Sequence, residues 1–247
     1  MLAINKSLPK SAIVNGDAIS LTESLASCTV SLVLTDPPYG IAKEGITGRS
    51  DNISYEGVLN KIRAPWDEPY QHFKRLFKGF YRALRPGGTL IVFYNGWYLG
   101  SIRDEALKAG FKSPRIIVWE KTNCIPINSK THYLSNSKEF AVVCVKGSNP
   151  IFNSEYDTGV YQYPFSNRRE LGIEHPTQKS LGLFKELISK HSVRDELVFD
   201  PFCGSNITGV AARSLGRRYI GGDLSRDYVT SVINKYSADF YLSERVL

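Results

Sequence analysis

The sequence predicts an α/β protein built on a single doubly wound, mostly parallel sheet. Two apolar runs, residues 30–35 and 196–200, are short and rich in β-branched and leucine side chains, as buried strands are. A loop of small residues, a helical stretch at 206–215 and a third strand at 219–223 follow the second run, which is the pattern of a βαβ unit. With 247 residues and 42% hydrophobic content, the chain can bury the core of one such domain.

The other elements follow from the same periodicities. Residues 69–84 carry apolar or aromatic side chains at the spacing of an amphipathic helix, and the Arg-Pro-Gly-Gly turn at 85–88 ends that helix. The remaining expected elements are a strand at 12–14, a helix at 20–26, a strand at 89–94, a helix at 97–109, and strands at 115–119 and 140–145.

Three polar segments show no clear period, at residues 42–66, 120–138 and 147–174. Long structureless stretches inside a compact domain are usually functional or mobile. We therefore expect one domain over residues 1–247, with a mobile loop at 42–66 and irregular insertions after it.

Charge and cysteine usage narrow the class of protein. A net charge of +7, from 31 Lys and Arg against 24 acids, suits a polyanionic partner such as DNA, although many soluble proteins are equally basic. The four cysteines have no paired spacing and the four histidines form no cluster, so we expect reduced thiols and no metal. Without a membrane-length apolar run or a secretory pattern, the expected location is cytoplasmic, away from membranes.

The strand at 30–35 ends in Asp-Pro-Pro-Tyr, where ligands of open α/β sheets bind. The exocyclic amine of a nucleobase is a poor nucleophile, because its lone pair is delocalised into the ring. Asp36 and the carbonyl of Pro37 could accept its two hydrogens and stabilise the charge that develops on alkylation. Tyr39 could stack on a base that has left the duplex. The alternative is a proline-rich turn in which Asp36 caps a neighbour.

The βαβ unit near the carboxyl end suits a nucleotide-like ligand. Its loop of small residues lets a ligand approach the backbone, and the helix amino end favours an anionic group. Asp223 lies 23 positions after Asp200, close to the spacing of an acid that binds ribose hydroxyls. Because G-x-G-x-x-G is absent, a nicotinamide dinucleotide is not favoured. An ordinary crossover with a glycine in its turn is the alternative.

Three motifs in a fixed order carry a family resemblance: Asp-Pro-Pro-Tyr at 36–39, His-Pro-Thr-Gln-Lys at 175–179 and Asp-Pro-Phe-Cys-Gly-Ser at 200–205. They resemble the β-class of DNA amino-methyltransferases, which use S-adenosylmethionine. The resemblance covers roughly residues 11–230. It implies a circularly permuted methyltransferase sheet, double-stranded DNA as substrate, and target-recognition segments within 120–174.

The resemblance also assigns roles to individual residues. The catalytic residues that it implies are Asp36, Pro37, Pro38 and Tyr39. The cofactor-binding residues that it implies are Asp17, Ala18, Thr177, Gln178, Lys179, Asp200, Phe202, Gly204, Ser205 and Asp223. Among these, Lys179 could pair with the cofactor carboxylate, and Asp17 falls where the family places the acid that accepts the adenine amino group. A plain turn at residues 15–17 is the alternative for Asp17.

One position departs from the family pattern, because Asn206 stands where glycine is usual. Asparagine tolerates left-handed backbone angles better than other non-glycine residues do, so we expect the loop to keep its shape. Its side chain could also cap the helix that starts there. The expectation is an active enzyme with modest affinity for the cofactor.

Four functions compete. The initial aspartate of the tetrapeptide leans toward adenine N6 in the family, while cytosine N4 offers an equivalent amine. A DNA-binding protein with a decayed cofactor site is the third reading, and methylation of RNA or protein amines is the fourth. The resemblance also allows a homodimer and a cognate restriction nuclease as partners.

Overall fold

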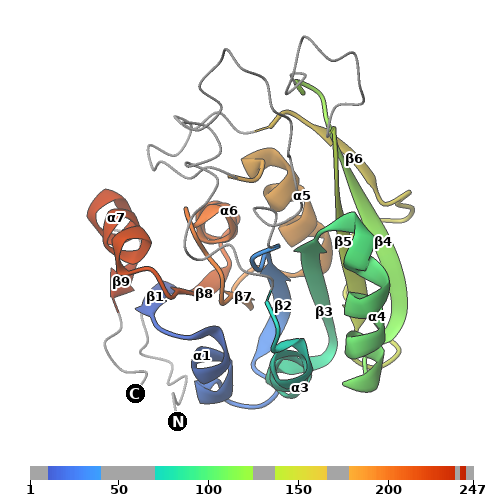
Figure 1. The fold of residues 1–247 in the computed structure, drawn as a ribbon, viewed down its shortest axis with the longest axis horizontal. Helices are drawn as coiled ribbons and strands as arrows, with labels where there is room; N and C mark the ends of the chain where they lie inside the picture. The colour runs from blue at the N-terminus through green and yellow to red at the C-terminus, as the bar shows by residue number, and fades with distance from the viewer. Residues whose placement is uncertain (1–10, 40–69, 125–136, 166–177, 237–239, 243–247) are drawn as a thin grey trace, which may run out of the picture.

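A computed structural model describes residues 11–39, 70–124, 137–165, 178–236 and 240–242. Within these residues the chain forms one nine-stranded sheet with helices on both faces (Figure 1). The predicted loop at 42–66 and Thr177 lie outside the described residues, as do parts of the predicted recognition segments, 125–136 and 166–174.

The elements alternate along the chain as an α/β pattern requires. The strands are β1 (Ser11–Asn15), β2 (Val30–Thr35), β3 (Leu84–Tyr94), β4 (Lys112–Lys121), β5 (Lys138–Val145), β6 (Val160–Tyr163), β7 (Leu197–Asp200), β8 (Arg218–Asp223) and β9 (Tyr241–Leu242). The helices are α1 (Ala18–Ser24), α3 (Phe73–Ala83), the 3-10 turn η2 (Gly96–Tyr98), α4 (Leu99–Lys108), α5 (Leu181–His191), α6 (Ile207–Ser214) and α7 (Arg226–Tyr236).

The sheet has the order β6-β4-β5-β3-β2-β7-β8-β1-β9. Only β5 runs against its neighbours among the described strands, which confirms the mostly parallel sheet. At its centre β2, from the first part of the chain, lies beside β7, from the last part, with Val33 opposite Phe199. This pairing brings the two sequence motifs that follow β2 and β7 to the same edge of the sheet.

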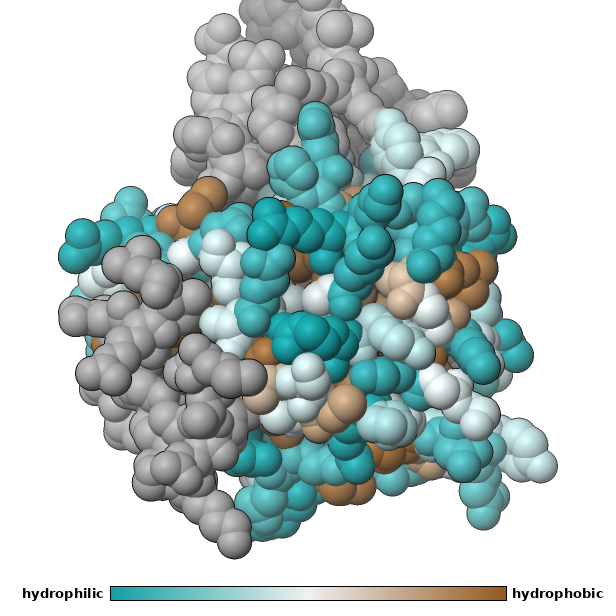
Figure 2. All heavy atoms as spheres, turned by 90° about the horizontal axis from the view of Figure 1, so that it is seen from below, coloured by the Kyte–Doolittle hydropathy of each residue, from teal (hydrophilic) through white to brown (hydrophobic). Residues whose placement is uncertain are grey.

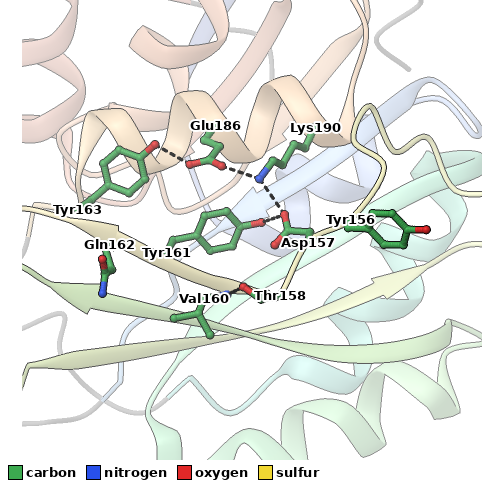
Figure 3. A pocket seen from close by; sticks show the side chains of 9 residues that line it. All are labelled: Tyr156, Asp157, Thr158, Val160, Tyr161, Gln162, Tyr163, Glu186 and Lys190. Carbon is green, nitrogen blue, oxygen red and sulfur yellow. Dashed lines mark hydrogen bonds and ion pairs between the residues drawn. The ribbon is translucent and has the colours of Figure 1, made fainter.

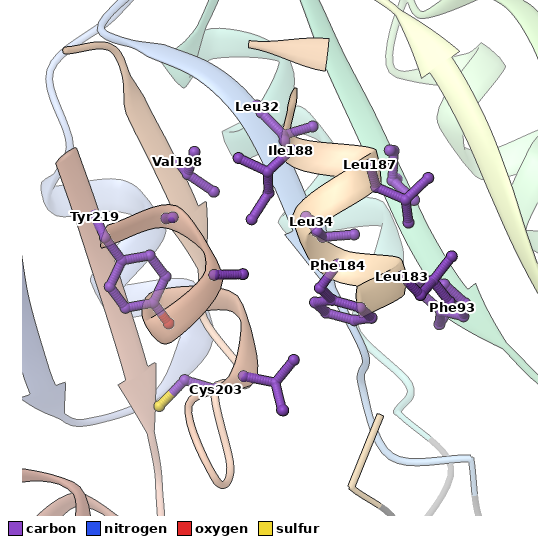
Figure 4. Packing of buried hydrophobic residues seen from close by; sticks show 14 of the residues in the cluster. Leu32, Leu34, Phe93, Leu183, Phe184, Leu187, Ile188, Val198, Cys203 and Tyr219 are labelled. Atoms are coloured by element: carbon purple, nitrogen blue, oxygen red, sulfur yellow. The ribbon is translucent and has the colours of Figure 1, made fainter. Parts of the chain in front are cut away.

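Two hydrophobic layers cover the two faces of the sheet. Successive side chains of a strand point to opposite faces, so Val33 packs with α1, α3 and α4 while Leu32 and Leu34 pack with α5, α6 and α7. Figure 4 shows the second layer, in which α5 lies over β2 and the ring of Phe184 stacks on Phe93 at 5.5 Å. Burial on both faces explains why these strands read as continuous apolar runs.

One face of the molecule is mainly polar. The face seen from below in Figure 2 is mainly hydrophilic, and its hydrophobic side chains form small, separated spots. None of the helices in the described ranges combines the length and the apolar character that crossing a membrane demands.

One expectation about the irregular segments is wrong. Strand β4 ends at Lys121, near the expected start of the segment 120–138, but β6 lies inside the segment 147–174, where it pairs parallel with β4. A four-residue strand has too few residues to show an alternation, and its pairing is decided by a partner some 40 positions earlier. Helices α5 and α7 were also not predicted, although α5 has the apolar i, i+4 pair Leu183 and Leu187.

Candidate active site

Four acids lie where four neighbouring parallel strands end. They are Asp17 after β1, Asp223 at the end of β8, Asp200 at the end of β7 and Asp36 after β2. The register confirms the alignment, since Asn15 pairs with Asp223 and Asp200 pairs with Gly221. The structure therefore gathers the predicted catalytic and cofactor-binding acids along the edge toward which β2 and β3 point in Figure 1.

Asp36 is bound by a buried lysine that the sequence had placed near the cofactor. The Nζ of Lys179 lies 2.6 Å from Oδ2 of Asp36 and 2.8 Å from Oε2 of Glu139. Glu139 in turn binds Lys121 through its other oxygen at 2.8 Å. Two carboxylates and two ammonium groups thus alternate in one chain of ion pairs, so their formal charges cancel.

Burial and pairing compete in setting the pKa values of this group. Burial raises the pKa of Asp36, Lys179 opposes that rise, and the charge of Glu139 adds to it. Burial alone would lower the pKa of Lys179, but Asp36 and Glu139 together hold it above its usual value. Likewise burial alone would raise the pKa of Glu139, but its two lysines hold it below the usual range. Asp36 is therefore a more basic carboxylate than an exposed aspartate.

Tyr39 completes the surroundings of Asp36. Its hydroxyl donates a hydrogen bond of 2.5 Å to Oδ1 of Asp36, and its ring meets the edge of Tyr94 at 5.3 Å. The Nζ of Lys179 lies 5.1 Å from the centre of the Tyr39 ring. In this state both carboxylate oxygens of Asp36 already accept a hydrogen, so an incoming amine would share or replace the bond from Tyr39.

Asp200 ties the loop at 201–205 to the strands instead of facing a ligand freely. Its carboxylate accepts hydrogen bonds from the hydroxyls of Thr35 at 2.7 Å and Thr208 at 2.5 Å, and from the backbone N–H of Phe202. Burial raises the pKa of Asp200 to about 7, against these bonds. Asp200 thereby links β2, β7 and α6 at the point where the two motifs meet.

Asp223 shapes the same loop from the neighbouring strand. Its two oxygens accept from the backbone N–H of Gly204 at 3.0 Å and of Ser225 at 2.8 Å. Gly204 has a φ of 48°, and Cys203 donates to the carbonyl of Gly222, so the loop turns sharply against β8. Burial raises the pKa of Asp223 above its usual value.

Asn206 has the left-handed backbone that the sequence predicts, with φ 66° and ψ 33°. The expected side-chain cap is wrong, because its amide makes no hydrogen bond to the start of α6. The side chain is fully buried beside Gly209, and neither amide atom has a partner among the described residues. Turned inward under the helix, it cannot reach the free N–H groups of the first turn.

Asp17 and Gln178, two further predicted cofactor-binding residues, differ in their contacts. The Oδ1 of Asp17 accepts from the N–H groups of Ile19 and Ser20, so Asp17 caps α1, which supports its local role as a turn residue. Gln178 is 2% exposed, and its amide has no partner among the described residues. A buried amide without partners calls for a ligand or a water molecule that would supply them.

An open pocket of about 340 Å³ lies between β6 and α5 (Figure 3). Its charged groups pair with one another: Lys190 lies 2.8 Å from Asp157 and 2.5 Å from Glu186, and Tyr163 donates to Glu186. These bonds brace β6 against α5. Among the described residues, no group of three or more His, Cys, Asp or Glu side chains could hold a metal ion.

No sequence motif includes Glu139, and in the sequence Lys121 is only one of many polar residues in the segment 120–138. The available signal was a single acid at the start of the otherwise apolar run 140–145. Its partner Lys179 lies 40 positions away, and only the folded sheet brings the two together.

Comparisons with known proteins identify the family of this chain. A model of the N6/N4 DNA methylase family matches residues 30–235. The type II methyltransferase M2.LlaDCHI of Lactococcus lactis subsp. cremoris is 27% identical over 232 residues, covering 88% of this chain and 86% of the relative. M2.DpnII of Streptococcus pneumoniae is 25% identical over 245 residues, covering 93% and 91%.

Two solved structures share the fold. The M1.HpyAVI–SAM complex superimposes with a TM-score of 0.67 at 24% identity, covering 91% of this chain and 98% of that one. The cytosine-N4-specific PvuII DNA methyltransferase gives a TM-score of 0.69 at 20% identity, covering 92% and 88%. Because the family match spans most of the chain and agrees with its three motifs, the chain belongs to the N6/N4 family of DNA methylases.

Proposed function

We propose that this methylase transfers a methyl group from S-adenosylmethionine to N6 of an adenine that has flipped out of double-stranded DNA. The observation that carries the proposal is the position of Asp36. It follows β2 directly and contacts Lys179 and Tyr39, and the loop at 201–205 follows the neighbouring strand β7. An acid beside an aromatic ring and next to a nucleotide-type loop suits methylation of a base amine.

The residues around the loop at 201–205 fit S-adenosylmethionine as the cofactor. The loop at 201–205 has a sharp backbone turn fixed by Asp223, and the buried amide of Gln178 has no partner in the described part of the chain. The structural neighbour M1.HpyAVI is itself a complex with SAM. When bound, S-adenosylmethionine supplies an electrophilic methyl group. We assign Asp223 to its ribose hydroxyls, and Gln178 to its methionine end.

Asp36 and the carbonyl of Pro37 would each accept one hydrogen of the target amine. As the amine takes the methyl group from the cofactor sulfur, which would leave as a neutral thioether, positive charge would develop on the amine and the Asp36 carboxylate would stabilise it. One amine proton leaves toward Asp36, whose raised pKa makes it a better acceptor. Tyr39 would stack on the flipped base, exchanging its bond to Asp36 for that contact.

A second candidate is methylation of cytosine N4, because the PvuII neighbour is cytosine-specific and both amines present two hydrogens. The first residue of the tetrapeptide is aspartate, which leans toward adenine in this family. The relatives M2.DpnII and M2.MboI are type II methyltransferases, which supports DNA as the substrate. The segments within 120–174 stay our prediction for target recognition.

Mass spectrometry of the modified base tests the proposal directly. Purified protein is incubated with double-stranded DNA and S-adenosylmethionine carrying a labelled methyl group, and the DNA is hydrolysed to nucleosides. We expect labelled N6-methyladenine and no labelled N4-methylcytosine. The reverse result would favour the cytosine activity, and absence of both from DNA that the protein binds would favour a decayed enzyme. The same assay with RNA would address the RNA alternative.

A homodimer and a cognate restriction nuclease also stay predictions. Sedimentation of the protein with and without DNA would measure its oligomeric state. Challenge of methylated DNA with nucleases of known recognition sequence would report the site that the enzyme protects.

A further inference from the structure

Glu139 lies at the start of β5, where the sheet approaches the catalytic edge. It pairs with Trp119 of β4, and its neighbour Phe140 pairs with Tyr94 of β3. Only 16% of the Glu139 side chain is exposed, although glutamate is seldom buried without a specific reason. Its two oxygens contact Lys121 and Lys179, so this residue joins the catalytic ion pair to the outer strands.

A lysine between two carboxylates differs from a lysine paired with one. Alone with Asp36, the buried ammonium of Lys179 would neutralise that carboxylate and hold it in a closed pair. With Glu139 at 2.8 Å, the ammonium divides its attraction between the oxygens of two carboxylates. Asp36 therefore stays oriented by Lys179, and its carboxylate can still accept a hydrogen bond from another donor.

We propose that Glu139 is a positioning residue for methyl transfer, which holds Lys179 between two carboxylates and so keeps Asp36 both fixed and strongly accepting toward the target amine. Lys121 completes the arrangement, because it balances the second acid and prevents an uncompensated buried charge. This inference rests on the proposed amine methylation at Asp36. It adds a residue outside the three sequence motifs to the machinery.

The pH dependence distinguishes this role from a purely structural one. The groups around Asp36 are Lys179 before α5, Glu139 on β5, Tyr39 in its own loop, Tyr94 on β3 and Asp200 on β7. Of these, Glu139 contributes a negative charge that raises the pKa of Asp36. Removing that charge should lower the pKa of Asp36, so the acid limb of the rate profile should move to lower pH.

The test variant is Glu139→Gln, which keeps the shape of the side chain and removes its charge. We expect kcat to fall on the order of tenfold to a hundredfold, the range known for removal of a residue that orients a metal ligand. The KM values for DNA and S-adenosylmethionine should change little, and the acid limb of kcat against pH should shift downward. Glu139→Asp should restore the position of the acid limb and part of the rate, because it restores the charge.

The matched control is Glu105→Gln, which removes a glutamate of α4 that pairs with Lys108 at 2.6 Å and lies outside the site and the predicted recognition segments. It should leave both rate and pH profile unchanged. If the wild type methylates DNA and Glu139→Gln has the same rate, the inference about Glu139 is wrong while the proposed function stands. A slower variant with an unshifted acid limb and a lower melting temperature would also overturn the inference. A wild type that methylates neither base would overturn the proposed function as well.

Discussion

The amide of Asn206 occupies the space that a side chain at position 209 would need. A Cβ atom placed on Gly209 would overlap with the amide of Asn206 and approach the ring of Tyr219 to 2.7 Å. Asn206 stands where the family has glycine, and its bulk lies under α6. The backbone of the loop consequently keeps its left-handed turn while the extra atoms point into the core.

Gly209→Ala should therefore destabilise the protein, although alanine is the better helix former. We expect a loss of about 1–3 kcal/mol, as for overpacked cores, outweighing the helix preference of about 1 kcal/mol. Urea unfolding would measure the change. Adding Asn206→Gly should recover part of the loss, because Tyr219 still limits the space; if the two changes were simply additive, the two side chains would not compete for one space.

Asp36→Ala should abolish methyl transfer and leave cofactor binding in place. Removing one positioned electrostatic partner commonly costs about 2.7–4 kcal/mol of barrier, or roughly a hundredfold to a thousandfold in rate. Single-turnover methylation and calorimetric titration with S-adenosylmethionine would separate the two effects. Asp104→Ala, which removes an exposed aspartate, is the control. Near-normal turnover of the Asp36 variant would contradict the assigned role.

Tyr39→Phe should keep most of the rate, whereas Tyr39→Ala should lose it. A flat ring suffices for stacking, and the hydroxyl only donates to Asp36 before the base arrives. For both variants, 2-aminopurine fluorescence would measure base flipping, and kcat would measure methyl transfer. Equal losses in the two would instead assign the essential function to the hydroxyl.

Asp223→Ala should raise the concentration of S-adenosylmethionine needed for half-maximal rate, because the loop loses its bond at Gly204 and the ribose loses an acceptor. The fold should be affected only modestly, since Asp223 is partly exposed at the end of β8. Calorimetric titration gives the affinity, and thermal unfolding of the free protein gives the stability. An unchanged cofactor affinity would show that Asp223 has no part in the cofactor site.

His191 should make the protein less stable in acid. Burial lowers its pKa to about 4, below the 6.5 of an ordinary histidine, so its contribution is full above pH 6.5 and is lost as pH falls toward 4. Between pH 7 and pH 5 this single group should cost about 2 kcal/mol. His191→Gln should flatten that part of the stability profile, measured by urea unfolding. His72→Gln, at an exposed position, is the control; an equal slope in the His191 variant and the wild type would refute the assignment.

Much of the fold and of the candidate site could be predicted from the sequence alone, because it depends on residues that are close together in the chain. Short apolar runs that end in Asp36 and Asp200 predicted buried parallel strands, and the order of the motifs predicted both the permuted sheet and the family. These features depend on neighbours along the chain, whose patterns can be read directly.

Tertiary structure decided what depends on partners far apart in the sequence. Strand β5 runs antiparallel beside β4, and this arrangement places Glu139 in contact with Lys179. On its other side, β4 pairs with the short strand β6. The inward turn of Asn206 likewise depends on a glycine one helical turn later and on a tyrosine from β8. Which side chains contact each other depends on their distance in the folded protein and on their burial. The spacing of residues along the chain encodes neither quantity.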